Sequence, residues 1–107
     1  MIAIEVYTQP DGELLGFCSK GHSGYSGAGY DIVCAAVSSA LYMAVNTITD
    51  VIKVTPELLY LDDGLMNFRI FTKDTAACRE LLMGLKLHLL GLEEEYTDYL
   101  KVSYMEV

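Results

Sequence analysis

The sequence predicts an α+β domain in the order ββαββαβ, with a largely antiparallel sheet and two helices packed on one face. Paired stretches of alternating apolar and polar residues are separated by turn residues, as expected of hairpins. Two longer stretches place apolar residues at helical spacing, and each follows one of the pairs. With 107 residues, the chain is expected to form one domain, residues 1–107.

The predicted strands are short, and two turns organise four of them into hairpins. The first turn is Gln9-Pro10-Asp11-Gly12, where proline and glycine suit the dihedral angles of a turn. The second is Asp62-Asp63-Gly64, a strong hairpin signal. The expected strands cover residues 2–7, 13–19, 57–61, 65–71 and 99–107.

The first helix is predicted to run from near Asp31 to near Lys53, and Pro56 fits just beyond its end. Residues 32–49 carry no charge, which is also a feature of membrane spans. The serine, asparagine and threonine residues within this stretch, and the lack of a flanking basic cluster, favour a helix buried on most sides instead. No membrane association is therefore expected.

The second helix is predicted to begin at Asp74 or Thr75 and to stop near Gly91. The acidic residues 93–95 would be unfavourable at a helix C-terminus, which is why the earlier end is expected. Both helices carry more apolar residues than one sheet face can cover. A subunit interface would cover the excess, so the chain is expected to form a homodimer.

Charge and cysteine content restrict the function. The net charge of -8 would repel nucleic acid and attract basic protein segments. Three cysteines without a secretory signal indicate reduced thiols in the cytoplasm. No two cysteines have CxxC spacing, so neither a metal site nor a redox pair is predicted, and no cofactor is expected.

The most informative segment joins a histidine to a cysteine through a glycine-bearing loop. Cys34 is expected in the first turn of the first helix, where the helix dipole favours a thiolate. His22 is a candidate base, because the intervening loop could fold back and bring its imidazole to the sulfur. The alternative is a small buried cysteine and a loop histidine with no role. The spacing alone leaves both interpretations open.

Other residues of the segment have two interpretations each. Asp31 either caps the helix or orients His22. Ser38, one turn after Cys34, either donates a hydrogen bond at the site or bonds to a carbonyl of its own helix. The remaining histidine and cysteines are interpreted as structural. The glycines predict a mobile loop over the site, and they are Gly24, Gly27 and Gly29.

The run Gly21-His22, the glycine-bearing loop and Asp31-Ile32-Val33-Cys34-Ala35-Ala36-Val37-Ser38 resembles the ribosomal-processing cysteine protease family, Prp. The resemblance extends over the full length. It implies a homodimeric cytoplasmic endopeptidase that removes a short N-terminal extension from the precursor of large-subunit ribosomal protein L-twenty-seven. It also implies that Cys34 is the nucleophile, that His22 is the general base and acid, and that Gly21, Asp31 and Ser38 support the site.

A second hypothesis belongs to another functional class. A non-enzymatic dimeric adaptor for ribosome assembly could bind basic protein tails through an acidic surface. It would explain the charge and the apolar helices, but it leaves the order of histidine, loop and cysteine to chance. The pH dependence of thiol alkylation separates the two hypotheses, since only the enzyme needs a reactive Cys34.

Overall fold

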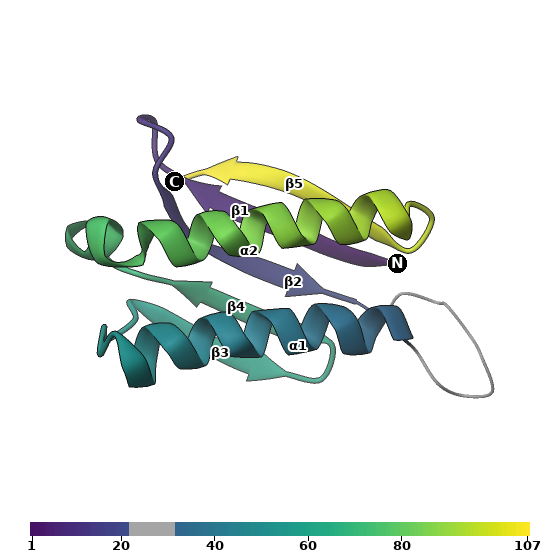
Figure 1. Ribbon diagram of the computed structural model, residues 1–107, viewed down its shortest axis with the longest axis horizontal. Coiled ribbons are helices and arrows are strands. Elements are labelled where there is room, and N and C mark those ends of the chain that lie inside the picture. The colour runs from purple at the N-terminus through teal and green to yellow at the C-terminus, as the bar shows by residue number, and fades with distance from the viewer. Residues whose placement is uncertain (22–31) are drawn as a thin grey trace.

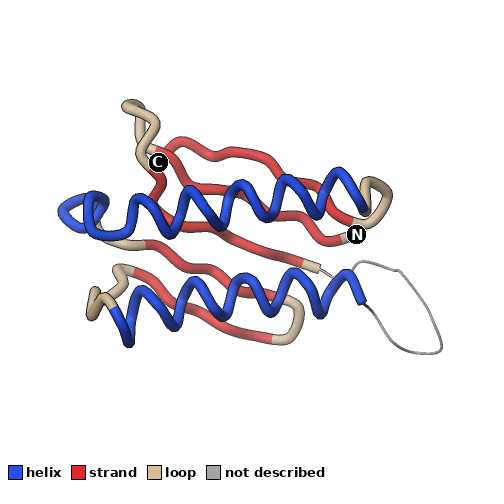
Figure 2. The backbone as a smooth tube through the Cα atoms, in the orientation of Figure 1, coloured by secondary structure: helices blue, strands red, loops and turns tan. Residues whose placement is uncertain are grey.

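The computed structural model describes residues 1–21 and 32–107, and it contains one five-stranded sheet with two long helices. The strand order in the sheet is β3-β4-β2-β1-β5, and both helices lie on the same side of the sheet (Figures 1 and 2). The predicted α+β class and element order are therefore confirmed. The elements are β1 (Ile2–Thr8), β2 (Leu14–Lys20), α1 (Ile32–Asn46), β3 (Leu58–Asp62), β4 (Leu65–Arg69), α2 (Thr75–Glu95) and β5 (Leu100–Glu106).

The sheet is largely antiparallel, as predicted. β1 pairs with β2, β2 with β4, and β3 with β4, all in antiparallel orientation. The exception is β5, which pairs with β1 in parallel orientation. The long connection through α2 makes this parallel pairing possible, because parallel neighbours need a crossover.

The core lies between the helices and the sheet, and β2 is at its centre. Phe17 of β2 and Phe68 of β4 are paired residues, and their ring centroids are 5.7 Å apart. Ile4 and Val6 of β1 are buried beside them. Ile2, Ile4 and Val6 are buried while Ala3 and Glu5 are less so, as the predicted alternation requires. Tyr7 departs from the prediction, because it is buried on the opposite face, where it contacts Asn67 and Arg69.

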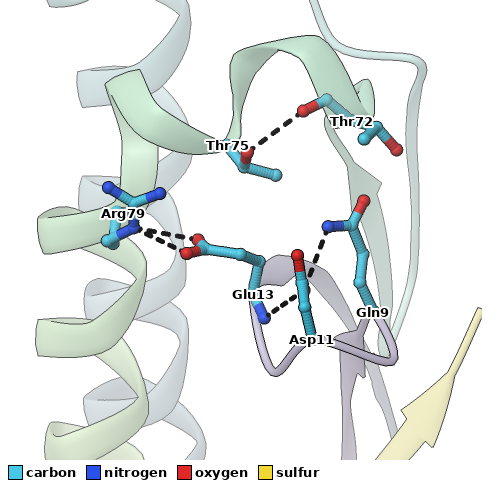
Figure 3. Close-up of polar contacts among 6 residues, drawn as sticks. All are labelled: Gln9, Asp11, Glu13, Thr72, Thr75 and Arg79. Atoms are coloured by element: carbon cyan, nitrogen blue, oxygen red, sulfur yellow. Dashed lines mark hydrogen bonds and ion pairs between the residues drawn. The ribbon is translucent and has the colours of Figure 1, made fainter.

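The turn between β1 and β2 is tied to α2 by polar contacts, which Figure 3 shows. Arg79 donates through Nε to both carboxylate oxygens of Glu13, at 2.8 and 3.0 Å. Asp11 accepts a hydrogen bond from the Glu13 amide at 2.9 Å. These contacts connect the far end of the hairpin to the N-terminal part of α2.

α1 is followed by a short π-helical segment, Thr47–Val51. The helical segment ends at Val51, and Lys53 has a φ of +67°, in the left-handed region. The predicted end of the helix near Lys53 is therefore close to the observed one. By length and apolar composition alone, Ile32–Val51 could cross a membrane. Its buried residues belong to the core formed with the sheet, as in the core helix of a globular domain.

The prediction that this helix is buried on most sides is wrong. Only 39% of its most apolar window is buried, and Tyr42, Met43 and Val51 are exposed. The reason is the architecture: a helix lying on one face of a single sheet has one side in the core, and nothing among the described residues covers its outer side.

α2 extends beyond its predicted end near Gly91 and includes all three acidic residues Glu93–Glu95. The Val102 amide of β5 donates to the Glu93 carboxylate at 2.6 Å. This long-range hydrogen bond compensates for a carboxylate near the negative end of the helix dipole.

Candidate active site

Cys34 lies at the beginning of α1, as the third residue of that helix. Its side chain is half-buried and packs against the core, and none of the three cysteines is in a disulfide. Backbone N–H groups in the first turn of a helix have no intrahelical acceptors, so they can stabilise negative charge. A thiolate at Cys34 would therefore be in a favourable place.

Cys34 opens into a cavity of about 250 Å³ between α1 and one end of the sheet. Ser38 and Tyr42 continue the wall along the same helix, so Cys34 and Ser38 face the same space, as their spacing of four predicts. The other wall residues are Ile2, Ser19, Gly21, Val37, Leu41, Asp62, Asp63, Gly64, Leu65 and Met66.

Gly21 forms part of the cavity wall at the end of β2, immediately before His22 in the chain. Its φ is +93°, a conformation that side chains disfavour, and a Cβ at this position would lie 2.6 Å from the Met1 carbonyl oxygen. The Gly21 amide donates to the Gly64 carbonyl at 2.8 Å. The glycine thus fixes the end of β2 against the β3–β4 turn.

The β3–β4 turn contributes an acidic wall that the sequence does not predict. The pattern Asp62-Asp63-Gly64 indicates only a hairpin, yet both aspartates line the cavity with Cys34. The Asp63 amide donates to the Asp62 carboxylate at 2.8 Å. No local signal could have revealed this role, because the turn reaches Cys34 through the tertiary fold. The described cavity wall contains no lysine or arginine, so it favours a cationic or hydrogen-bond-donating ligand.

Several predicted site residues lie outside the described residues. They are His22, Asp31, and the loop glycines Gly24, Gly27 and Gly29. Their assignments as base, supporting residue and mobile loop remain predictions. Of the other predicted residues, Gly21, Cys34 and Ser38 line one cavity, so the described structure brings all three together.

The remaining histidine and cysteines are away from this cavity. His88 is on α2 and lines a separate, mainly apolar groove between the two helices. Cys18 and Cys78 are buried in the core. Burial raises the pKa of the Cys78 thiol, and the nearby Asp74 carboxylate raises it further, so this thiol stays protonated at neutral pH. Among residues 1–21 and 32–107, no cluster of three ligating side chains could hold a metal ion.

The sequence matches the profile of the family described as "Cysteine protease Prp" over residues 1–101. Two similar proteins are each named "Ribosomal processing cysteine protease Prp". The one from Staphylococcus aureus is 29% identical over 106 residues, covering 97% of this chain and 99% of the relative. The one from Bacillus subtilis is 29% identical over 108 residues, covering 96% of each chain.

Solved structures agree with the sequence comparison. A crystal structure of the S. aureus protease with a covalently linked product peptide is 26% identical, has a TM-score of 0.87, and covers 98% of this chain and 100% of that one. A second, with a substrate peptide, is 25% identical with a TM-score of 0.84 and the same coverage. Family membership favours the enzyme over the adaptor hypothesis. Because the profile matches residues 1–101 of its 107, this chain belongs to the cysteine protease Prp family.

Proposed function

We propose that this protein is a cysteine endopeptidase with Cys34 as its nucleophile and His22 as its general base and acid. One observation carries the proposal: the Cys34 thiol lies at the start of α1 in the wall of a cavity, in a chain of this protease family. The helix start stabilises the thiolate, and the cavity offers space for the substrate carbonyl.

The reaction follows from these roles. His22 takes the thiol proton, and the Cys34 sulfur attacks the scissile carbonyl carbon. N–H groups at the start of α1 stabilise the oxyanion, and the loss of one such donor typically raises the activation barrier by about 3 kcal/mol. His22 then protonates the leaving amine, which departs and leaves a thioester. Water attacks the thioester, releases the new carboxylate and restores the thiol.

We propose a ribosomal protein precursor as the substrate, since the similar proteins from S. aureus and B. subtilis are named as ribosomal processing proteases. The finer assignment is removal of the N-terminal extension of ribosomal protein L-twenty-seven. The acidic cavity wall and the net charge of -8 support a basic substrate. Ribosomal proteins are rich in basic segments, so electrostatic attraction would bring such a precursor to the site.

The test is incubation with the extended precursor, followed by mass analysis of the new N-terminus. Cys34→Ala and His22→Ala are expected to abolish cleavage. The chain supplies a matched control for the nucleophile: Cys78→Ala removes a buried thiol in the core. This control should keep processing. Complete processing by the Cys34→Ala protein would refute the assignment.

Thiol chemistry gives an independent test of the same site. Among variants that each retain one cysteine, the protein with Cys34 should be alkylated at pH values well below about 8.5, the usual pKa of a free thiol. The protein with Cys78 should react slowly because its thiol is buried and its pKa is raised. Equal, slow alkylation of all three cysteines would contradict a catalytic thiolate.

We also propose that the protein acts as a homodimer in the cytoplasm. The exposed groove between α1 and α2 is mainly apolar and includes Met43, Leu81 and Leu85, which supports a subunit contact there. Met43→Glu should then produce a monomer in light scattering, whereas Leu87→Glu, which places the charge outside the groove, should not. The cytoplasmic assignment rests on the odd number of cysteines in the sequence, and cell fractionation would test it.

A further inference from the structure

We infer that the outer edge of β3 binds the substrate peptide as an added strand and leads it to Cys34. The inference rests on the proposed peptidase function. β3 is at one edge of the sheet and, within the described part of the chain, pairs with β4 only. Such an edge presents unpaired backbone N–H and C=O groups. Extended peptides bind to edges of this kind through main-chain hydrogen bonds.

Apart from the charge of Asp62 at its end, the β3 edge lacks the features that usually block strand addition. Natural edge strands are commonly protected by lysine, proline or a β-bulge. β3 has the sequence Leu-Leu-Tyr-Leu-Asp, without lysine or proline, and its pairing with β4 continues without a bulge. Leu59, Tyr60 and Leu61 are 42, 50 and 48% exposed. An unprotected apolar edge risks aggregation, so its presence indicates a binding function.

The apolar edge is continuous with the candidate active site. β3 ends at the turn whose Asp62 and Asp63 line the cavity with Cys34. In Figure 1 this turn lies at the same end of the molecule as the beginning of α1. A peptide paired with β3 would therefore be directed along the edge toward the thiol.

The register predicts which side chains the peptide meets. Leu59 and Leu61 are paired with Phe68 and Met66, whose side chains are buried on the helix side of the sheet. Paired residues point to the same face, so both leucines are on the helix side, although α1 leaves them exposed. Every second side chain of an added strand would face them.

The size of the edge sets the length of the recognised segment. Five residues of β3 span about 16 Å at the usual rise of a strand. The inferred ligand is thus a segment of roughly five substrate residues on one side of the scissile bond. Its apolar side chains would alternate, because only one face of the added strand meets Leu59 and Leu61.

The first experiment measures kcat/KM on a set of substrate peptides, each methylated at one backbone nitrogen. An added strand donates hydrogen bonds from every second amide toward the edge. Methylation should therefore lower kcat/KM about tenfold or more at alternate residues on one side of the cut, with little effect at the residues between. Equal effects at neighbouring residues, or none, would overturn strand addition.

The second experiment assigns the effect to this edge. Leu59→Ala and Leu61→Ala should each raise KM several-fold while kcat changes little, since they remove binding contacts away from the thiol. Leu87→Ala is the matched control, because Leu87 is an exposed leucine of α2 that lines neither the cavity nor the edge. Circular dichroism and urea unfolding should show that all three variants keep their fold.

A double-mutant cycle tests whether Leu61 and a substrate side chain interact directly. Replacing a substrate leucine that faces Leu61 by alanine should be less harmful to the Leu61→Ala enzyme than to the parent protein. Additive losses at every substrate position would overturn the inference while leaving cleavage by Cys34 intact. Failure of the unmodified protein to cleave the precursor would instead overturn the proposed function, so the two outcomes are distinguishable.

Discussion

Gly21→Ala should destabilise the protein more than Gly12→Ala, although the two glycines have nearly the same φ. Gly21 has φ of +93° and Gly12 has φ of +90°. A non-glycine residue in this region typically costs about 1–2 kcal/mol of stability. The gain from a less flexible unfolded chain is also shared by both alanine variants. These two effects therefore nearly cancel in the comparison.

The difference comes from the space around the new Cβ. At Gly12 no atom lies within 4 Å, whereas at Gly21 the Met1 carbonyl oxygen lies at 2.6 Å. That contact is too short for a Cβ, so Met1 or the end of β2 must shift. Overpacking of this kind typically costs about 1–3 kcal/mol. Before the unfolded-state gain common to both variants is subtracted, the predicted costs are about 1–2 kcal/mol for Gly12→Ala and about 2–5 kcal/mol for Gly21→Ala.

Urea unfolding measures both free energies, and each kcal/mol also corresponds to about 4 °C or more in Tm for a domain of this size. Peptidase activity gives a second measurement. The shift at Gly21 disturbs the cavity wall and the hydrogen bond to Gly64, so kcat/KM should fall for Gly21→Ala only. Equal destabilisation by the two variants would refute the assigned contact with Met1.

Three further predictions concern single polar groups. Tyr7→Phe should cost about 1 kcal/mol by removing the hydrogen bond to Asn67. Burial raises the Tyr7 pKa, so the phenol ionises more readily in the unfolded chain, and the parent protein should lose stability as pH rises above about 10. In urea unfolding, the difference in free energy of unfolding between the parent protein and Tyr7→Phe should therefore shrink above that pH. Arg79→Ala should cost less than about 1 kcal/mol in the same assay, because its pair with Glu13 is exposed. Asp63→Asn should weaken the salt dependence of kcat/KM on a basic peptide, and an unchanged dependence would contradict an electrostatic role of the cavity wall.

Local patterns in the sequence were sufficient to predict the secondary structure and the position of the thiol. Apolar residues at helical spacing placed the start of α1 near Asp31, and Ile32 is its first described residue. This is why Cys34 could be assigned to the first turn of a helix. Burial of Ile2, Ile4 and Val6 likewise follows from simple alternation in β1.

The errors occurred where a distant residue decides the local structure. The end of α2 was placed four residues too early, because the acidic run considered alone disfavours a helix C-terminus. The Val102 amide supplies the missing partner for Glu93, nine residues away and on another element. The parallel pairing of β5 with β1 agrees with the prediction of a largely antiparallel sheet, but it also depends on a contact between the two ends of the chain. Neither contact has a signature in a short sequence window.

The acidic cavity wall shows the same limit at the functional site, and it also explains how the site is assembled. Gly21 and Gly64 are 43 residues apart in sequence, yet the amide of one donates to the carbonyl of the other at 2.8 Å. This hydrogen bond holds the end of β2 beside the turn that follows β3. The strand that precedes His22 and the edge proposed to bind the peptide are therefore fixed to each other. A substrate guided by β3 would reach Cys34 at a place whose geometry is set by the sheet itself.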